Sequence, residues 1–294
     1  MPNNHSRSSA AVPPERAARS AVRRRLHALI DSLDRNLSAL NRAVTPAAVH
    51  RSRVSARRLR VFLRVFLHAP APTTVDRHIE ALRQFGHYLD AVREADVVQE
   101  AILRLAGKRK SPAATQFAGI YARTVRERAR AVRKLEVRVN AGTWTRRIKR
   151  IRGLAGESSP IAESRDPIAR PAMRQLEKRR RRLLAALRRE CKTPLKLHRL
   201  RLKIKFLRYL CEEWPWPSRG LQQSQIKQLR GLQSCLGDLH DGWQLQEIFL
   251  GDTRFPDAAR ELSFRLAIEQ RQHMSEFRRR RNGLLRAWNA KRRS

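Results

Sequence analysis

Two stretches of the chain, residues 49–60 and 197–208, carry histidine and basic residues in the same order and at the same spacing. In each, a histidine is followed by an arginine, then by an arginine or lysine, then by a leucine–arginine pair. The matched pairs are His50 with His198, Arg53 with Arg201, Arg57 with Lys205, Leu59 with Leu207, and Arg60 with Arg208. Guanidinium and ammonium groups donate charge-assisted hydrogen bonds to phosphate and carboxylate oxygens. The repeated pattern therefore indicates a site for an anion.

A helix is the element that can hold these side chains together. At about 100° per residue, the basic residues of each stretch fall beside the histidine on one helix face, while the leucines occupy the opposite face. The first basic stripe consists of His50, Arg53, Arg57, Arg60 and Arg64. The second basic stripe consists of His198, Arg201, Lys205 and Arg208. Both stretches are thus predicted to be amphipathic helices with one cationic face.

The alternative for each stripe is an ordinary solvated helix face. Such faces usually mix charges of both signs, because like charges four residues apart destabilise a helix and opposite charges stabilise it. Yet no Asp or Glu occurs between Asp34 and Asp76, and none occurs between Glu190 and Glu212. Two windows without acids, each containing one stripe, favour anion binding over plain surface charge.

The whole chain is strongly basic. Its 294 residues include 65 Lys and Arg against 26 Asp and Glu, a net charge of +39. This charge repels itself, and a polyanionic partner relieves the repulsion. The partner classes are nucleic acid, an anionic membrane surface and a phosphate polymer. With 41% hydrophobic residues the chain is predicted to fold around an apolar core.

Cysteine use and hydropathy indicate a cytoplasmic protein. The three cysteines, Cys191, Cys211 and Cys235, are widely spaced and contain no C-x-x-C pair, which favours reduced thiols over a disulfide frame or a zinc site. No apolar run approaches the ~20 residues of a membrane span. We therefore expect a soluble protein of the cytoplasm.

Helical periodicity extends over most of the chain and breaks at Pro, Gly and Ser clusters. The pattern predicts helices over 15–43, 46–67, 75–105, 113–140, 168–191, 194–213, 219–249 and 257–290, with a short helix over 143–153. We expect a disordered tail over 1–16, a first helical half over 17–152, a linker over 153–171 and a second half over 172–294. The fold class is therefore all-α.

A second pair of segments repeats in the same order as the stripes. LRQFGHYLDAVREAD, which begins at Leu82, matches LRGLQSCLGDLHDGW, which begins at Leu229. Together with VHRSRVSARRLRVFLRVF and LHRLRLKIKFLRYLCEEW, these segments resemble the conserved histidine α-helical domain, or CHAD domain, over about residues 18 to 290. Asp90 stands where that family prefers Gly, and Glu94 where it prefers Asp. We expect this departure to affect the local helix geometry more than the basic stripe.

The resemblance implies two pseudo-symmetric helical bundles, of about four helices each, that form a central basic groove or pore. It also implies that the ligand is inorganic polyphosphate and that the protein associates with polyphosphate granules, where granule-associated or polyphosphate-metabolising proteins are candidate partners. Polyphosphate suits the stripes, because every unit is a charged acceptor for guanidinium groups. Each histidine either donates a hydrogen bond to phosphate, gaining charge beside it, or stays neutral and positions neighbouring arginines.

The candidate binding residues are the two stripes, with a second tier outside them. The second tier consists of Arg58, Arg126, Arg130, Arg133 and Lys203. The alternative partner is nucleic acid, bound non-specifically through its backbone. Single-strand binders interleave basic residues with aromatics that stack on bases, whereas the aromatics near the stripes lie mostly at apolar positions. This distribution favours polyphosphate.

An enzyme is the third interpretation. Asp238, His240 and Asp241, with Glu94 and Asp96 in the first repeat, are conceivable metal ligands or a general base. Their spacing suits salt bridges to basic residues of the facing stripe helix equally well. No P-loop, H-E-x-x-H or G-x-S-x-G motif occurs. We therefore expect a binding protein with no catalytic residues, no metal and no cofactor.

Overall fold

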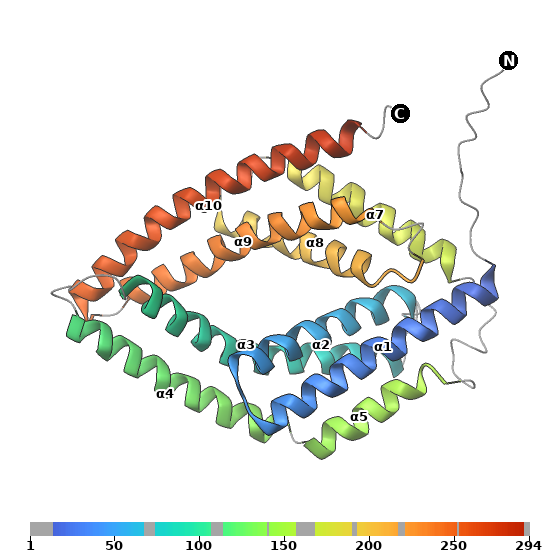
Figure 1. Cartoon of the computed structure of the whole chain (residues 1–294), viewed down its shortest axis with the longest axis horizontal. Helices are drawn as coiled ribbons and strands as arrows, with labels where there is room; N and C mark the ends of the chain where they lie inside the picture. Colours follow the sequence, from blue (N-terminus) through green and yellow to red (C-terminus); the bar gives the residue numbers. More distant parts are fainter. Residues whose placement is uncertain are drawn as a thin grey trace.

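All regular structure in the computed structural model is helical (Figure 1) within the residues it describes, 14–67, 74–106, 114–139, 141–156, 168–189, 193–216, 221–251 and 253–290. The helices are α1 (Glu15–Arg42), α2 (Pro46–Phe66), α3 (Thr74–Ala106), α4 (Ala114–Arg138), α5 (Ala141–Gly153), α7 (Ala169–Arg188), α8 (Pro194–Glu212), α9 (Gln223–Leu250) and α10 (Pro256–Ala290). The predicted all-α class is confirmed.

The predicted helix ends agree best at α1, α2, α8 and α10, each within one residue, and least at α9, which begins at Gln223 rather than at 219. Helix α1 begins at Glu15, inside the predicted tail. Residues 1–13 of that tail, residues 157–167 of the predicted linker and Cys191 lie outside the described residues. Within the described ranges, no helix is long and apolar enough to cross a membrane.

The helices that carry the two stripes start in the same way. Each follows a threonine, Thr45 or Thr193, whose side-chain oxygen accepts the backbone N–H three residues later, at 3.1 and 3.3 Å respectively. A proline then occupies the first helical position, where its missing N–H costs nothing. Because His50 and His198 both lie four residues after that proline, the two stripes begin in the same helical register.

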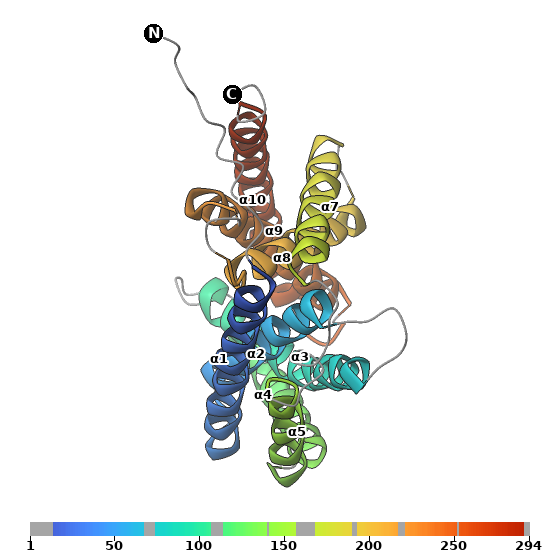
Figure 2. The same ribbon diagram turned by 90° about the vertical axis from the view of Figure 1, so that its right-hand side faces the viewer.

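The helices form two groups. Helices α1 to α5 lie in the lower part of Figure 1 and α7 to α10 in the upper part, and α2 meets α7 and α8 between them. Figure 2, turned by 90°, shows the same separation. In the described residues the lower group has five helices and the upper group four, where about four each are predicted. Pseudo-symmetry between the groups and the predicted domain boundaries stay predictions.

Apolar side chains pack between the two groups of helices, and two of these contacts flank the site described below. One is aromatic: Phe66, at the end of α2, has its ring centroid 5.5 Å from that of Trp214 and 5.8 Å from that of Trp216, which follow α8. The other is a separate apolar cluster. Its members come from α3, α4, α9 and α10 and include Val98, Phe117, Ile120, Leu245, Phe249 and Leu262. We call these the aromatic junction and the distal cluster.

Ion pairs reinforce the aromatic junction. Glu212 and Glu213, at the end of α8, are both nearly inaccessible to solvent, and Glu213 is 1% exposed. Arg25 of α1 pairs with Glu213, and Arg58 of α2 lies 3.3 Å from an oxygen of each glutamate. Buried carboxylates need such partners because an unpaired buried charge is costly. This network ties α1 and α2 to the end of α8.

Candidate anion-binding site

Both basic stripes reach one cavity of about 640 Å³, which we call the central cavity. Helix α2 contributes His50, Arg53, Val54 and Arg57, and helix α8 contributes His198, Arg201, Leu202, Lys205 and Tyr209. The structure therefore brings together six of the nine stripe residues, from segments that lie far apart in the sequence. The identical starts of α2 and α8 present these side chains at matching heights along their helices.

The other three stripe residues lie beside the central cavity. Arg60 lines a smaller adjoining cavity of about 130 Å³ together with Arg53 and Arg57. Arg64 is exposed on α2 and close enough to Arg60 to lower its pKa. Arg208 is buried, and it donates hydrogen bonds to Gln233 at 2.7 Å and to Glu212 at 2.6 Å. Arg208 thus connects the ion-pair network at the end of α8 to a residue that lines the central cavity.

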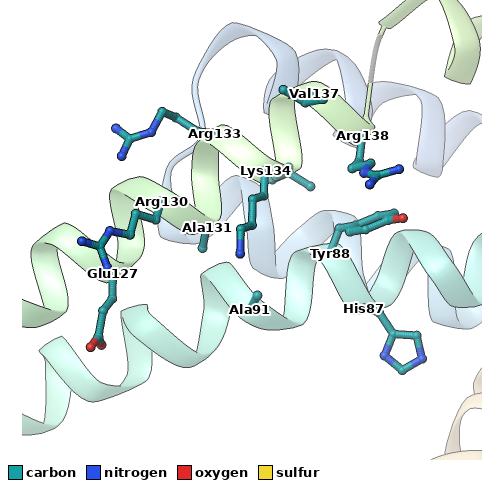
Figure 3. Close-up of a pocket in the computed structure, with 11 residues that line it drawn as sticks. His87, Tyr88, Ala91, Glu127, Arg130, Ala131, Arg133, Lys134, Val137 and Arg138 are labelled. Carbon is teal, nitrogen blue, oxygen red and sulfur yellow. The ribbon is translucent and has the colours of Figure 1, made fainter.

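The second-tier residues do not line the central cavity. Arg58 belongs to the ion-pair network with Glu212 and Glu213. Lys203 is exposed on α8, and Arg126 is exposed on α4. Arg130 and Arg133 line a different, open cavity of about 780 Å³ between α3 and α4. Figure 3 shows Lys134 of this second cavity pointing from α4 toward α3, whereas Arg133 points outward.

Lys205 has the most perturbed environment among the cavity cations. Its side chain is buried, and the guanidinium groups of Arg201, Arg57 and Arg53 surround it. Burial disfavours the ammonium form, and the three arginines repel it further, so the pKa of Lys205 falls to about 6. At neutral pH the free protein therefore holds Lys205 mainly as the uncharged amine.

The cavity arginines are also partly desolvated. Burial lowers the pKa of Arg53 and of Arg201, and burial together with Arg57 and Arg64 lowers the pKa of Arg60 to about 10. All three stay charged at pH 7. Removing a cation from water weakens its hydration, and an anion that enters the cavity replaces the lost water contacts. The site is thus suited to receive negative charge.

Three histidines of the central cavity are neutral at pH 7 in the free protein. Burial and the neighbouring cations lower the pKa of His50 and of His198, and they lower that of His240 to about 4. The ring centroids of His198 and His240 lie 4.6 Å apart. Both histidine roles stay open, since a neutral ring can position an arginine and a polyanion can restore the ring's charge.

Helices α3 and α9 supply the lining residues that the stripes alone do not predict. Helix α3 contributes His87, Asp90, Arg93, Glu94, Val97 and Val98, and helix α9 contributes Gln233, His240, Asp241, Gln244, Leu245 and Ile248. The two repeated partner segments, residues 82–96 and 229–243, lie on these helices, and their repetition was the sequence signal for these walls of the cavity. That signal marked the segments without showing which of their side chains face the stripes.

Three of the four carboxylates considered as metal ligands lie close to basic side chains. Asp241 lies 4.0 Å from Arg201 of the second stripe, and Asp238 lies 3.9 Å from Nδ1 of His273. Asp96 accepts a hydrogen bond of 2.6 Å from Arg128 of α4, rather than from a stripe helix. Among the described residues, no group of three or more His, Cys, Asp or Glu side chains could hold a metal ion.

Known structures share this fold. The crystal structure of the CHAD domain from the plant Ricinus communis has 22% sequence identity and a TM-score of 0.67, and the match covers 90% of this chain and 91% of that one. PptA from Streptomyces chartreusis has 17% identity and a TM-score of 0.60, with 92% and 99% covered. A comparison with curated proteins gave no significant match.

The family profile of the CHAD domain matches residues 16–250. That span is most of the chain and includes both stripe helices and both partner segments. The resemblance seen in the repeated motifs is therefore confirmed, and the chain belongs to the CHAD domain family.

Proposed function

We propose that this chain binds inorganic polyphosphate in the central cavity. The observation that carries the proposal is the convergence of two repeated basic stripes on one cavity. Arginine forks match phosphate oxygens in pairs, and rigid helices hold the cavity arginines at fixed positions. A polymer longer than the cavity extends along α2, where Arg60 and Arg64 continue the first stripe.

The cavity composition favours a polyanion without bases over nucleic acid. Among the Tyr, Phe and Trp side chains of the described residues, only that of Tyr209 lines the cavity. Its side chain is 3% exposed, and the Arg208 guanidinium lies over its ring at 4.1 Å. A base cannot stack on a covered ring, so the stacking that single-strand binders use is not offered here.

Binding without catalysis is part of the proposal. Two of the three acids that line the cavity in the described residues, Asp90 and Asp241, have arginine partners. A role at cytoplasmic polyphosphate granules follows from high affinity for the polymer, and it would bring the chain near granule-associated or polyphosphate-metabolising proteins.

Competition binding tests the proposal. Labelled long-chain polyphosphate is bound at physiological salt, and unlabelled polyphosphate, DNA or RNA is added at equal phosphate concentration. We expect polyphosphate to compete at least about tenfold better than either nucleic acid, since it has the higher charge density and needs no stacking. Equal competition would instead support non-specific nucleic-acid binding through the backbone.

A further inference from the structure

The two halves of the central cavity differ at one matched position. When Leu82 is aligned with Leu229, Asp90 of α3 corresponds to Gly237 of α9. Arg53 forms an ion pair with the carboxylate of Asp90. Its counterpart Arg201 lies over Gly237, where an added Cβ would sit 3.5 Å from Nη2 and 3.7 Å from Nε. At this matched position, Arg53 therefore meets a carboxylate, whereas Arg201 meets a glycine.

Asp90 does not distort the helix that carries it. Helix α3 runs unbroken from Thr74 to Ala106, so the expected change in local helix geometry is not observed. Asp90 instead adds a negative charge to the part of the central cavity that α3 lines. Asp90 raises the pKa of the nearby Glu94 carboxyl, after the larger effect of burial, and counteracts the lowering of the pKa of Arg60. The side chains of Asp90 and Arg53 are 31% and 23% exposed, so their pairing is only partly screened by water.

We propose that Asp90 holds the phosphate position of Arg53 in the free protein and must be displaced by an incoming polyanion. The inference rests on the proposed function. Arg201 instead has the carboxylate of Asp241 at 4.0 Å, so the half of the cavity with Gly237 is more accessible to an anion than the half in which Asp90 pairs with Arg53. A ligand with a single phosphate brings too little charge to replace a tethered carboxylate, whereas a dense polymer brings many phosphates at once. Asp90 therefore sets selectivity for long polyphosphate over small phosphate anions.

Two reciprocal substitutions test this asymmetry. Asp90→Ala frees Arg53, so we expect polyphosphate affinity to rise about five- to tenfold at physiological salt and the slope of log affinity against log salt to steepen by about one. Gly237→Asp introduces the competitor beside Arg201, and we expect the opposite change in both quantities. An added Cβ at Gly237 makes ordinary van der Waals contact with Arg201, so the first atom of the new side chain meets no clash.

Two further variants separate local competition from net charge. Glu136→Gln removes the same charge from an exposed position on α4, outside the central cavity. Asp90→Ala combined with Arg53→Gln removes the competitor and its target together, so the gain in affinity should vanish. Circular dichroism verifies that each variant stays helical.

The outcomes distinguish this inference from the proposed function. Failure of the unaltered protein to bind polyphosphate would overturn the proposed function. If the unaltered protein binds, but Asp90→Ala binds no more tightly than Glu136→Gln, Asp90 is not a competitor. A gain that persists in the double variant with Arg53→Gln also overturns the inference, because Asp90 would then act through the general field. Inorganic orthophosphate is the small-anion probe, and its inhibition of polymer binding should strengthen in Asp90→Ala.

Discussion

Polyphosphate binding should be coupled to proton uptake by Lys205. With a pKa of about 6 in the free protein, roughly half of the Lys205 side chains carry a proton at pH 6 and roughly one in a hundred at pH 8. A bound polyanion favours the ammonium form and raises the pKa. Affinity is therefore greatest below the free pKa and falls as pH rises above it, by about fifty-fold between pH 6 and pH 8 if binding requires the charged form.

The measurement is a binding titration of long-chain polyphosphate at pH 7.0, 7.5 and 8.0 and constant ionic strength. His50, His198 and His240 also have pKa values below the ordinary 6.5 in the free protein, so protonation that the polymer induces in these rings adds to the uptake. Calorimetry in buffers of different ionisation enthalpy should show an uptake of close to one proton more per binding event for the unaltered protein than for a variant that is charged at position 205 throughout. Each whole pH unit should cost nearly tenfold in affinity.

Lys205→Arg is the matched control, because an arginine keeps its charge throughout this pH range. Between pH 7 and pH 8 the affinity of the variant should fall by close to tenfold less than that of the unaltered protein, and the variant should take up about one proton fewer from the buffer. A pH-independent affinity of the unaltered protein, without proton uptake, would refute the reasoning. It would mean either that Lys205 is already charged in the free protein or that the polymer does not approach it.

Two further predictions concern the cavity cations and the ion-pair network. Arg57→Gln with Arg201→Gln should weaken polyphosphate binding by at least about a hundredfold and flatten the slope of log affinity against log salt by about two. Arg130→Gln with Arg133→Gln, in the open cavity between α3 and α4, should weaken binding by less than about tenfold. Similar losses in two folded double variants would show that diffuse charge does the binding. Glu213→Gln should lower the free energy of unfolding in urea by about 1.5 kcal/mol, because the partly exposed guanidinium groups of Arg25 and Arg58 lose their ion pairs with its buried carboxylate. An unchanged unfolding midpoint would show that the network adds nothing to stability.

The sequence was sufficient to predict the helices and the residues of the stripes, because both follow from local spacing. Apolar residues at helical period determine the helices, and the repeat of His50 and His198 determines which helices correspond. The Thr–Pro starts at 45–46 and 193–194 could also have been read as matched caps, since both signals are local. Local patterns of this kind are the strength of sequence analysis.

Side-chain partners from distant segments could not be predicted in the same way. Arg208 has the phase of a stripe residue, yet it turns to Glu212 and Gln233 because buried carboxylates at the end of α8 need cations. Arg58 is drawn into the same network from a helix more than 150 residues away in the chain. The position of a residue on a helix predicts the direction of its side chain but not the charged group from a distant segment that it meets.

The aromatic junction and the distal cluster fix the spacing between the walls of the central cavity. The guanidinium groups of Arg53 and Arg57 repel that of Arg201, and the apolar contacts between the helix groups help to offset this electrostatic work in the free protein. Under the proposed function, a bound polyanion neutralises these cations and removes that work. Its binding should therefore appear as a large rise in melting temperature with almost no change in helical content.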